Sequence, residues 1–161
     1  MSSLGWIITT GIGIAVAGVS AVFVVSLLRS RRRSNVGKHQ LPRARQLFHL
    51  RREWLEAEFL TLASHSGRPR GLAWADCDFD DDVTFARDRT SGQLRAFVGV
   101  AISFEAIEGG GMEDNPNVSN VRAATAVFNF DGAWTTEGRA IFNLNPTEAI
   151  RHFQSELEMV E

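Results

Sequence analysis

Aspartates form the most conspicuous group of chemically capable residues in this sequence. Asp76, Asp78 and Asp80 alternate along the chain, and Asp81 and Asp82 follow directly. Alternate residues of an extended strand point to the same face of a sheet, so the first three carboxylates would share one face. Grouped carboxylate oxygens are typical ligands of Ca²⁺ or Mg²⁺. The pattern therefore allows a divalent metal site at Asp76, Asp78 and Asp80.

An exposed strand that ends in a solvated turn explains the same aspartates, and we favour this interpretation. A calcium-binding EF-hand loop would need Gly where the sequence has Asp81 and Glu where it has Arg87. Arg87 and Arg89 on a returning strand would instead face the aspartates and pair with them. We therefore expect an acidic surface rather than a metal centre.

The other residue types that carry chemistry do not form a known motif. The histidines are His39, His49, His65 and His152. None of them has the spacing of a zinc ligand set, and the single cysteine is Cys77. Cys77 alternates with the aspartates, so it would face the opposite, apolar side of the strand. We expect no cofactor and no catalytic residue, which favours a binding protein over an enzyme.

An apolar pocket between a sheet and a helix is a second candidate site. Two tryptophans would line it and three charged residues would supply polar contacts: Trp74, Trp134, Arg122, Glu137 and Arg139. Ligand sites typically combine an apolar lining with a few placed polar groups. The interpretation that we favour is that the tryptophans fill the core, while Glu137 and Arg139 form an ordinary surface pair.

Strands with alternating apolar residues would position these side chains. The alternation predicts five strands, at about 71–78, 83–90, 93–107, 119–130 and 133–144. Asp80 to Asp82 should form a turn, and Asp131-Gly132 is a strong hairpin signal. The glycine-rich segment 108–120 should be a long loop between the third and fourth strands.

Two helices should frame this sheet. The first should run from Pro42 to His65, with one apolar side made of Phe48, Leu55, Phe59 and Leu62. The second should begin at Asn145, because Asn145 to Glu148 matches a capping box with Pro in the first turn. Its apolar side would consist of Ile150, Phe153 and Leu157.

The expected order is a helix, five mainly antiparallel strands and a closing helix, which is an α+β domain over residues 42–161. This element order resembles the cystatin-like and NTF2-like cone folds over roughly residues 42–158. In those folds a long N-terminal helix lies across a bent antiparallel sheet. The resemblance implies a topology and carries no functional residue, because no sequence motif supports it.

An apolar segment precedes this domain. Residues 4–28 contain no charged side chain and would form about 37 Å of helix, which is enough to cross a bilayer. A cleavable signal peptide would carry its positive charges before the apolar stretch. Here the basic residues follow it: Arg29, Arg31, Arg32, Arg33 and Lys38. We therefore predict that residues 1–28 form an N-terminal tail with a single transmembrane helix, with the N-terminus outside and the C-terminal domain in the cytoplasm.

The segment from residue 29 to 41 should be a basic juxtamembrane linker. Its arginines and lysine would contact lipid headgroups, and the lack of interleaved aromatic residues argues against nucleic acid. Within the span, Gly13, Ala17 and Ala21 recur every four residues. Such a small-residue face allows close packing of a homo-oligomer, although small residues are also common in any membrane helix.

The charge distribution divides the chain. Residues 1–52 contain nine Lys/Arg and no Asp/Glu, whereas residues 53–161 contain eight Lys/Arg and nineteen Asp/Glu. The bilayer would attract the first part and repel the second. We expect a single-pass membrane protein that presents an acidic binding or assembly module to a basic protein partner. The alternative is a cone-like domain that binds a small ligand or acts as an enzyme in an interior cavity, with a divalent metal at Asp76–Asp82.

Overall fold

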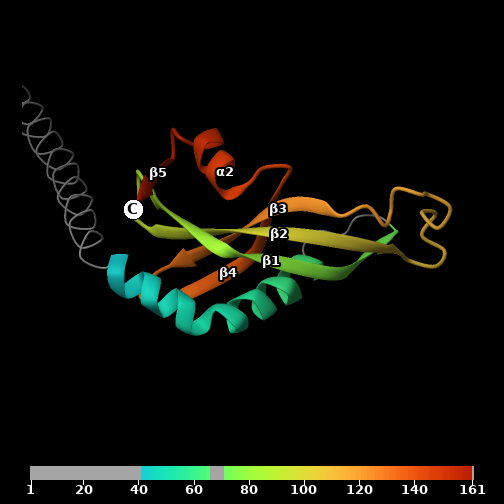
Figure 1. Cartoon of the computed structure of the whole chain (residues 1–161), viewed down its shortest axis with the longest axis horizontal. Helices are drawn as coiled ribbons and strands as arrows, with labels where there is room; N and C mark the ends of the chain where they lie inside the picture. Colours follow the sequence, from blue (N-terminus) through green and yellow to red (C-terminus); the bar gives the residue numbers. More distant parts are fainter. Residues whose placement is uncertain (1–40, 66–70, 161) are drawn as a thin grey trace, which may run out of the picture.

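The computed structural model describes residues 41–65 and 71–160 (Figure 1). Residues 41–65 are helical, and we refer to them as helix 41–65. The elements that follow are β1 (Leu72–Asp88), β2 (Leu94–Ala106), β3 (Arg122–Phe130), β4 (Trp134–Phe142), α2 (Pro146–His152) and β5 (Leu157–Val160). The strands form one antiparallel sheet in the order β4-β3-β2-β1-β5. The α+β class with five antiparallel strands is thus confirmed.

The predicted membrane anchor falls outside this part of the chain. Residues 4–28 are not among the described residues, and the predicted linker 29–41 overlaps them only at Leu41, which is helical. Across residues 41–65 and 71–160, no helix combines the length and the apolar character that crossing a membrane requires.

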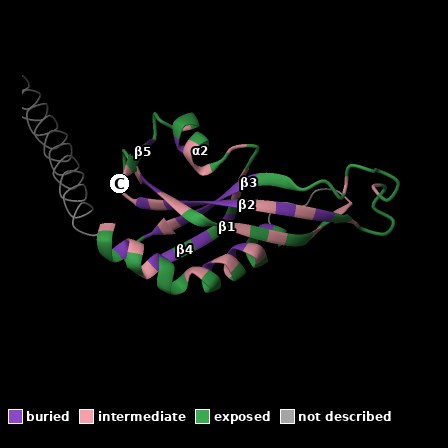
Figure 2. Cartoon of the chain, in the orientation of Figure 1, coloured by how far each residue is buried: buried purple, intermediate pink, exposed green. Residues whose placement is uncertain are grey.

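Helix 41–65 lies across one face of the curled sheet, and its buried side packs on the apolar residues of the strands to form the main core (Figures 1 and 2). Phe48, Leu55 and Phe59 are fully buried, as their spacing predicts. The Phe48 ring centroid lies 5.0 Å from that of Trp134 and 5.4 Å from that of Phe128. Edge-to-face packing at such distances adds to the stabilisation that burial alone provides. This face of the sheet is therefore a dense aromatic layer.

One residue of the predicted apolar stripe, Leu62, is not buried in the structure. Leu62 is 39% exposed, while the neighbouring Ala63 is 2% exposed and takes its place in the core. The reason is close packing against β4. Gly138 lies so near the helix that an added Cβ would be 2.5 Å from the Ala63 backbone nitrogen. The same added atom would lie 2.8 Å from the Leu62 Cβ, so Leu62 lies at the edge of this contact and is only partly covered by β4.

Helix α2 covers part of the opposite face. Its Ala149 and Ile150 pack with Phe97, Val127 and Leu157 in a second apolar cluster. The cluster arises because β2 alternates, with Val98 and Val100 directed to helix 41–65 and Phe97 directed to α2. The capping box at the start of α2 is confirmed, since Asn145 and Glu148 each accept a hydrogen bond from the other's backbone nitrogen.

The prediction of two separate strands at 71–78 and 83–90 is wrong. Residues 72–88 form the single strand β1, and Asp80 to Asp82 form a bulge instead of a turn. Phe79 pairs with Val100 and Val83 pairs with Val98, so three residues of β1 oppose the single residue Gly99. A bulge bends a strand without ending it, which keeps both halves paired with β2.

The predicted length of the final helix is also wrong. Helix α2 ends at His152, and Leu157 begins β5, which pairs with Phe85 to Asp88 of β1. The Leu157 backbone nitrogen donates to the Phe153 carbonyl, which closes the turn between the two elements. Ile150 and Leu157 enter the same cluster although one lies in a helix and the other in a strand. Helical spacing alone therefore could not reveal the change of element.

The predicted long loop and the predicted hairpin are both present in the structure. Residues 107–121 form the long connection between β2 and β3, and residues 131–133 join β3 to β4. Gly132 has φ of +79°, a conformation that Asp-Gly hairpins commonly use. Phe130 pairs with Trp134, so the hairpin loop has three residues where a two-residue loop is expected.

Candidate functional site

Asp76, Asp78 and Asp80 lie on the sheet face opposite helix 41–65, and we refer to them as the aspartate face. Asp76 pairs with Ser103 and Asp78 pairs with Ala101, and directly paired residues share a face. The Asp80 carboxylate lies against the Cα side of Gly99, in the space that a side chain would occupy there. All three aspartates are exposed. The alternation in the sequence thus corresponds to three solvent-facing carboxylates on one side of the sheet.

Small residues surround the aspartate face. On β2 the neighbours are Gly99, Ala101 and Ser103, and α2 packs further along the sheet over Phe97. Because none of these three side chains is large, they leave the carboxylates accessible from the solvent. This part of the sheet is an open acidic surface rather than an enclosed pocket.

Arg52 of helix 41–65 holds the bulge from the other face. Its guanidinium donates hydrogen bonds to the backbone carbonyls of Asp80 and Asp81 and pairs with Glu56 at 2.7 Å. Its side chain is only 17% exposed. The bulge frees two carbonyls from the strand ladder, and Arg52 satisfies them. Sequence reasoning missed this residue, because its partners lie 29 and 28 positions away.

Cys77 points away from the aspartates, toward the core on the side of helix 41–65, as the alternation predicts. Burial, together with the negative charge of Asp76, raises the pKa of the Cys77 thiol to about 11. A thiol with this pKa stays protonated near neutral pH and is a poor nucleophile. Cys77 therefore behaves as a small apolar residue of the core.

The prediction that Arg87 and Arg89 lie on a returning strand opposite the aspartates is wrong, because Arg87 belongs to β1 itself and Arg89 follows directly after it. Arg89 donates to the carbonyls of Gln154 and Leu157 and lies 3.9 Å from the Glu158 carboxylate. Arg87 pairs in register with Leu94, at the far end of β1 from Asp76. Within residues 41–65 and 71–160, no three His, Cys, Asp or Glu side chains converge as a metal site would require.

Asp88 forms the best-defined ion pair of the sheet. Its carboxylate accepts from Arg95 at 2.7 Å and from the Thr90 and Ser91 backbone nitrogens at 3.0 and 2.8 Å. Burial alone would raise the pKa of Asp88. The hydrogen bonds from Ser91 and Thr90 and the charge of Arg95 outweigh it and hold that pKa below its ordinary value. This group stabilises the β1–β2 turn.

The residues of the predicted ligand pocket lie in separate environments. Trp134 is 1% exposed, and its indole nitrogen donates to the Ala44 carbonyl at 2.7 Å. Trp74 packs against Phe104 near the other end of the sheet, with ring centroids 5.6 Å apart. The charged members Arg122, Glu137 and Arg139 are exposed. The Arg139 guanidinium lies 5.8 Å from the Phe153 ring centroid, on the side of α2.

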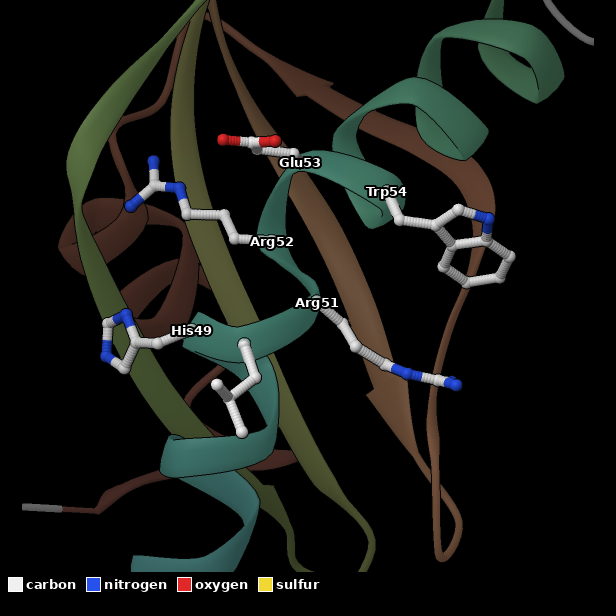
Figure 3. A pocket seen from close by; sticks show the side chains of 6 residues that line it. His49, Arg51, Arg52, Glu53 and Trp54 are labelled. Carbon is white, nitrogen blue, oxygen red and sulfur yellow. The ribbon is translucent and has the colours of Figure 1, made fainter.

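Hollows occur on the outer surface of the domain. One of about 410 Å³ lies along helix 41–65 between His49 and Trp54 (Figure 3). In this view Arg51 and Trp54 point to one side of the helix, and His49 and Arg52 point toward β1. Another hollow, of about 470 Å³, is lined by Ser64, His65 and residues near Trp74. These are open depressions over exposed side chains, unlike the filled layer between helix and sheet.

Charge adds to this description of the surface. Residues 71–160 contain fifteen Asp/Glu and six Arg, and helix 41–65 contains four Arg and three Glu. The acidic excess therefore belongs to the sheet and its loops.

Comparison with known proteins gives no match to a family model, to a curated protein or to a solved structure.

Proposed function

We propose that this chain is a single-pass membrane protein whose acidic α+β domain serves as a binding or assembly module at the cytoplasmic face. The observation that carries the proposal is the aspartate face, where Asp76, Asp78 and Asp80 are exposed together above small neighbours. The apolar segment 4–28 and the basic residues that follow it supply the anchor and its orientation.

The partner that suits this surface is a basic protein segment. Three carboxylates on adjacent alternate positions create a local negative potential, which raises the association rate of a positively charged partner. Such recognition depends on ionic strength, because salt screens exposed charges. Binding through the aspartate face should therefore weaken sharply as the salt concentration rises.

The filled core supports a binding surface over an interior ligand site. Helix 41–65 crosses the curled sheet as in the cystatin-like and NTF2-like arrangements, and we infer the same general topology here. Phe48, Phe59, Phe128 and Trp134 occupy the space between helix and sheet, where a cone-like fold would hold a ligand. Their packing favours the exposed surface as the functional region.

A charge-matched pair of variants tests the proposal in the full chain. The triple variant Asp76→Asn, Asp78→Asn, Asp80→Asn removes three charges from the aspartate face with little change in side-chain size. The control Glu108→Gln, Glu113→Gln, Asp114→Asn removes three charges from the loop between β2 and β3. Each protein is used to capture partners from membrane extracts at low and high salt, and captured proteins are identified by mass spectrometry.

The expected result is a salt-sensitive basic partner that binds the full chain and the loop control but not the aspartate variant. Equal capture by all three proteins would contradict a role for the aspartate face. Loss of capture in the loop control alone would move the binding surface to the loop.

A further inference from the structure

The outward side of helix 41–65 carries large apolar side chains that are exposed and lie outside the core. Leu50 is 73% exposed and Trp54 is 55% exposed. They are four positions apart, so they are neighbours on the helix surface. Arg43, Leu50, Trp54, Ala57 and Thr61 share this side, and all five are exposed. We refer to these five residues as the outer stripe.

The outer stripe differs in charge from the rest of the domain. Its five residues include the basic Arg43 and no acidic residue, and the exposed Glu53 lies at its edge, next to Leu50 and Ala57. Arg51 lies beside it, with its guanidinium carbon 5.7 Å from the centre of the Trp54 ring. Arg51 and Trp54 project to the same side of the helix (Figure 3). An indole next to a guanidinium is typical of the membrane–water interface, where the ring meets the headgroup layer and the cation meets lipid phosphate.

We propose that the outer stripe rests on the headgroup layer of the membrane in which the chain is anchored. The proposal depends on the anchoring proposed above. Twelve residues, 29–40, separate the predicted span from helix 41–65, and they reach at most about 43 Å. This stretch is basic, so anionic lipid draws it and the adjoining helix toward the surface.

The orientation that follows explains the charge division of the chain. The outer stripe and the aspartate face lie on opposite sides of the domain, because the stripe is on the far side of helix 41–65 and the aspartates are on the far side of the sheet. With the stripe on the bilayer, the carboxylates point away from anionic lipid. The membrane contact therefore leaves the acidic surface free for its partner.

A second copy of the chain suits the outer stripe less well. A stable protein interface buries about 800 Å² on each partner, whereas a tryptophan buries about 150 to 250 Å² and the stripe has only two large apolar side chains. A tethered membrane contact needs less area, because the anchor already holds the helix at the surface. The stripe therefore fits a lipid surface.

Tryptophan quenching in vesicles tests this contact. The full chain and its Trp54→Phe variant are reconstituted into vesicles of zwitterionic and anionic phospholipid, with bromine atoms on acyl carbons near the headgroups. The chain has four tryptophans, so the wild-type signal minus the Trp54→Phe signal isolates Trp54. We expect this difference signal to be shifted to the blue, to lose most of its intensity to the bromolipid and to be shielded from iodide.

Two arginine variants provide the matched comparison. Arg51→Gln should reduce the quenching of Trp54 by bromolipid in anionic vesicles. Arg151→Gln removes the same charge from the exposed end of α2, on the opposite side of the sheet, and should leave the quenching unchanged. Equal effects of the two variants would contradict a specific contact at Trp54.

Flotation of the vesicles separates the possible failures. If the full chain does not float with the vesicles, the anchoring proposal fails, and the membrane contact fails with it. If the chain floats but Trp54 is quenched by iodide and not by bromolipid, the anchor stands and the contact of the outer stripe is wrong. If Trp54 is shielded from both quenchers and the shielding is lost on dilution with lipid, a second copy covers the stripe and the proposal is overturned.

Discussion

The two faces of the sheet differ in how they are covered. On the side of helix 41–65, fully buried aromatic rings such as Phe48, Phe59 and Phe128 form a continuous layer. On the other side, α2 and its Ile150 cover only one part, and the aspartate face remains exposed. One face is thus filled for stability, while the other keeps a charged area open. The charged area stays open because the second cluster, under α2, covers only part of that face.

Removal of a ring from the first face should have the largest effect on stability. Phe48→Ala should lower the free energy of unfolding by about 4 kcal/mol, because the ring is fully buried among four aromatic side chains. Ile150→Ala in the smaller second cluster should cost roughly 2 to 3 kcal/mol. Urea unfolding of the full chain in nonionic detergent measures both. A larger loss of unfolding free energy for Ile150→Ala than for Phe48→Ala would contradict the conclusion that the main core lies between helix 41–65 and the sheet.

Two glycines, one on each face, allow a sharper comparison. Gly138 has φ of +69°, and an added Cβ would lie 2.5 Å from the Ala63 nitrogen and 2.7 Å from the Leu62 carbonyl carbon. Gly138→Ala should therefore cost about 2 to 3 kcal/mol.

The nearest atoms to an added Cβ at Gly99 would be those of the Asp80 side chain, whose carboxylate can rotate into solvent. Gly99→Ala should cost less than about 1 kcal/mol in the same unfolding experiment. Equal losses at the two glycines would show that the aspartate side is as tightly packed as the helix side.

The ion pair at Asp88 should have a smaller effect, which depends on pH. Asp88→Asn should lower stability by about 1 kcal/mol near neutral pH, because the charge-assisted bond to Arg95 is lost. The folded pKa of Asp88 lies below its ordinary value of 3.8, so its stabilisation is present above that value and is lost as the pH falls through the folded pKa. The difference between wild type and variant should shrink on acidification. A difference that stays constant down to the acid transition would contradict this account.

Substitution on the open face should have the smallest effect. Asp78→Ala should change the unfolding free energy by no more than about 0.5 kcal/mol, because the side chain is exposed. Thermal unfolding with and without Ca²⁺ or Mg²⁺ extends the measurement. A rise in Tm with the metal that disappears in Asp78→Ala would favour the metal-binding alternative over an acidic docking surface.

Local patterns predicted much of the fold. The alternation of apolar residues over Leu94 to Phe104 gave the correct faces of β2, and the spacing of Phe48, Leu55 and Phe59 gave the buried side of helix 41–65. The capping box located the start of α2. Each of these signals depends on residues within a few positions of one another, so the sequence contains it directly.

Contacts between distant segments could not be predicted in this way. Three consecutive aspartates are typical of a turn, but Arg52 and Gly99 together accommodate them as a bulge. The side-chain partners of Arg89 likewise depend on β5, whose pairing with β1 has no local signal. The positions of the aspartates on one face followed from alternation, whereas the contact of Arg52 with the backbone of Asp80 and Asp81 depended on how the helix packs on the sheet.

Membrane fractionation combined with protease protection tests the central claim most directly. The full chain with a C-terminal tag is expressed in intact cells, and membranes are washed with alkaline carbonate and then treated with protease from either side. We expect the protein to stay in the washed membranes, and its C-terminal domain to be digested only from the cytoplasmic side. Full-length protein in the soluble fraction, or digestion of the domain from outside, would contradict a cytoplasmic module held by an N-terminal anchor.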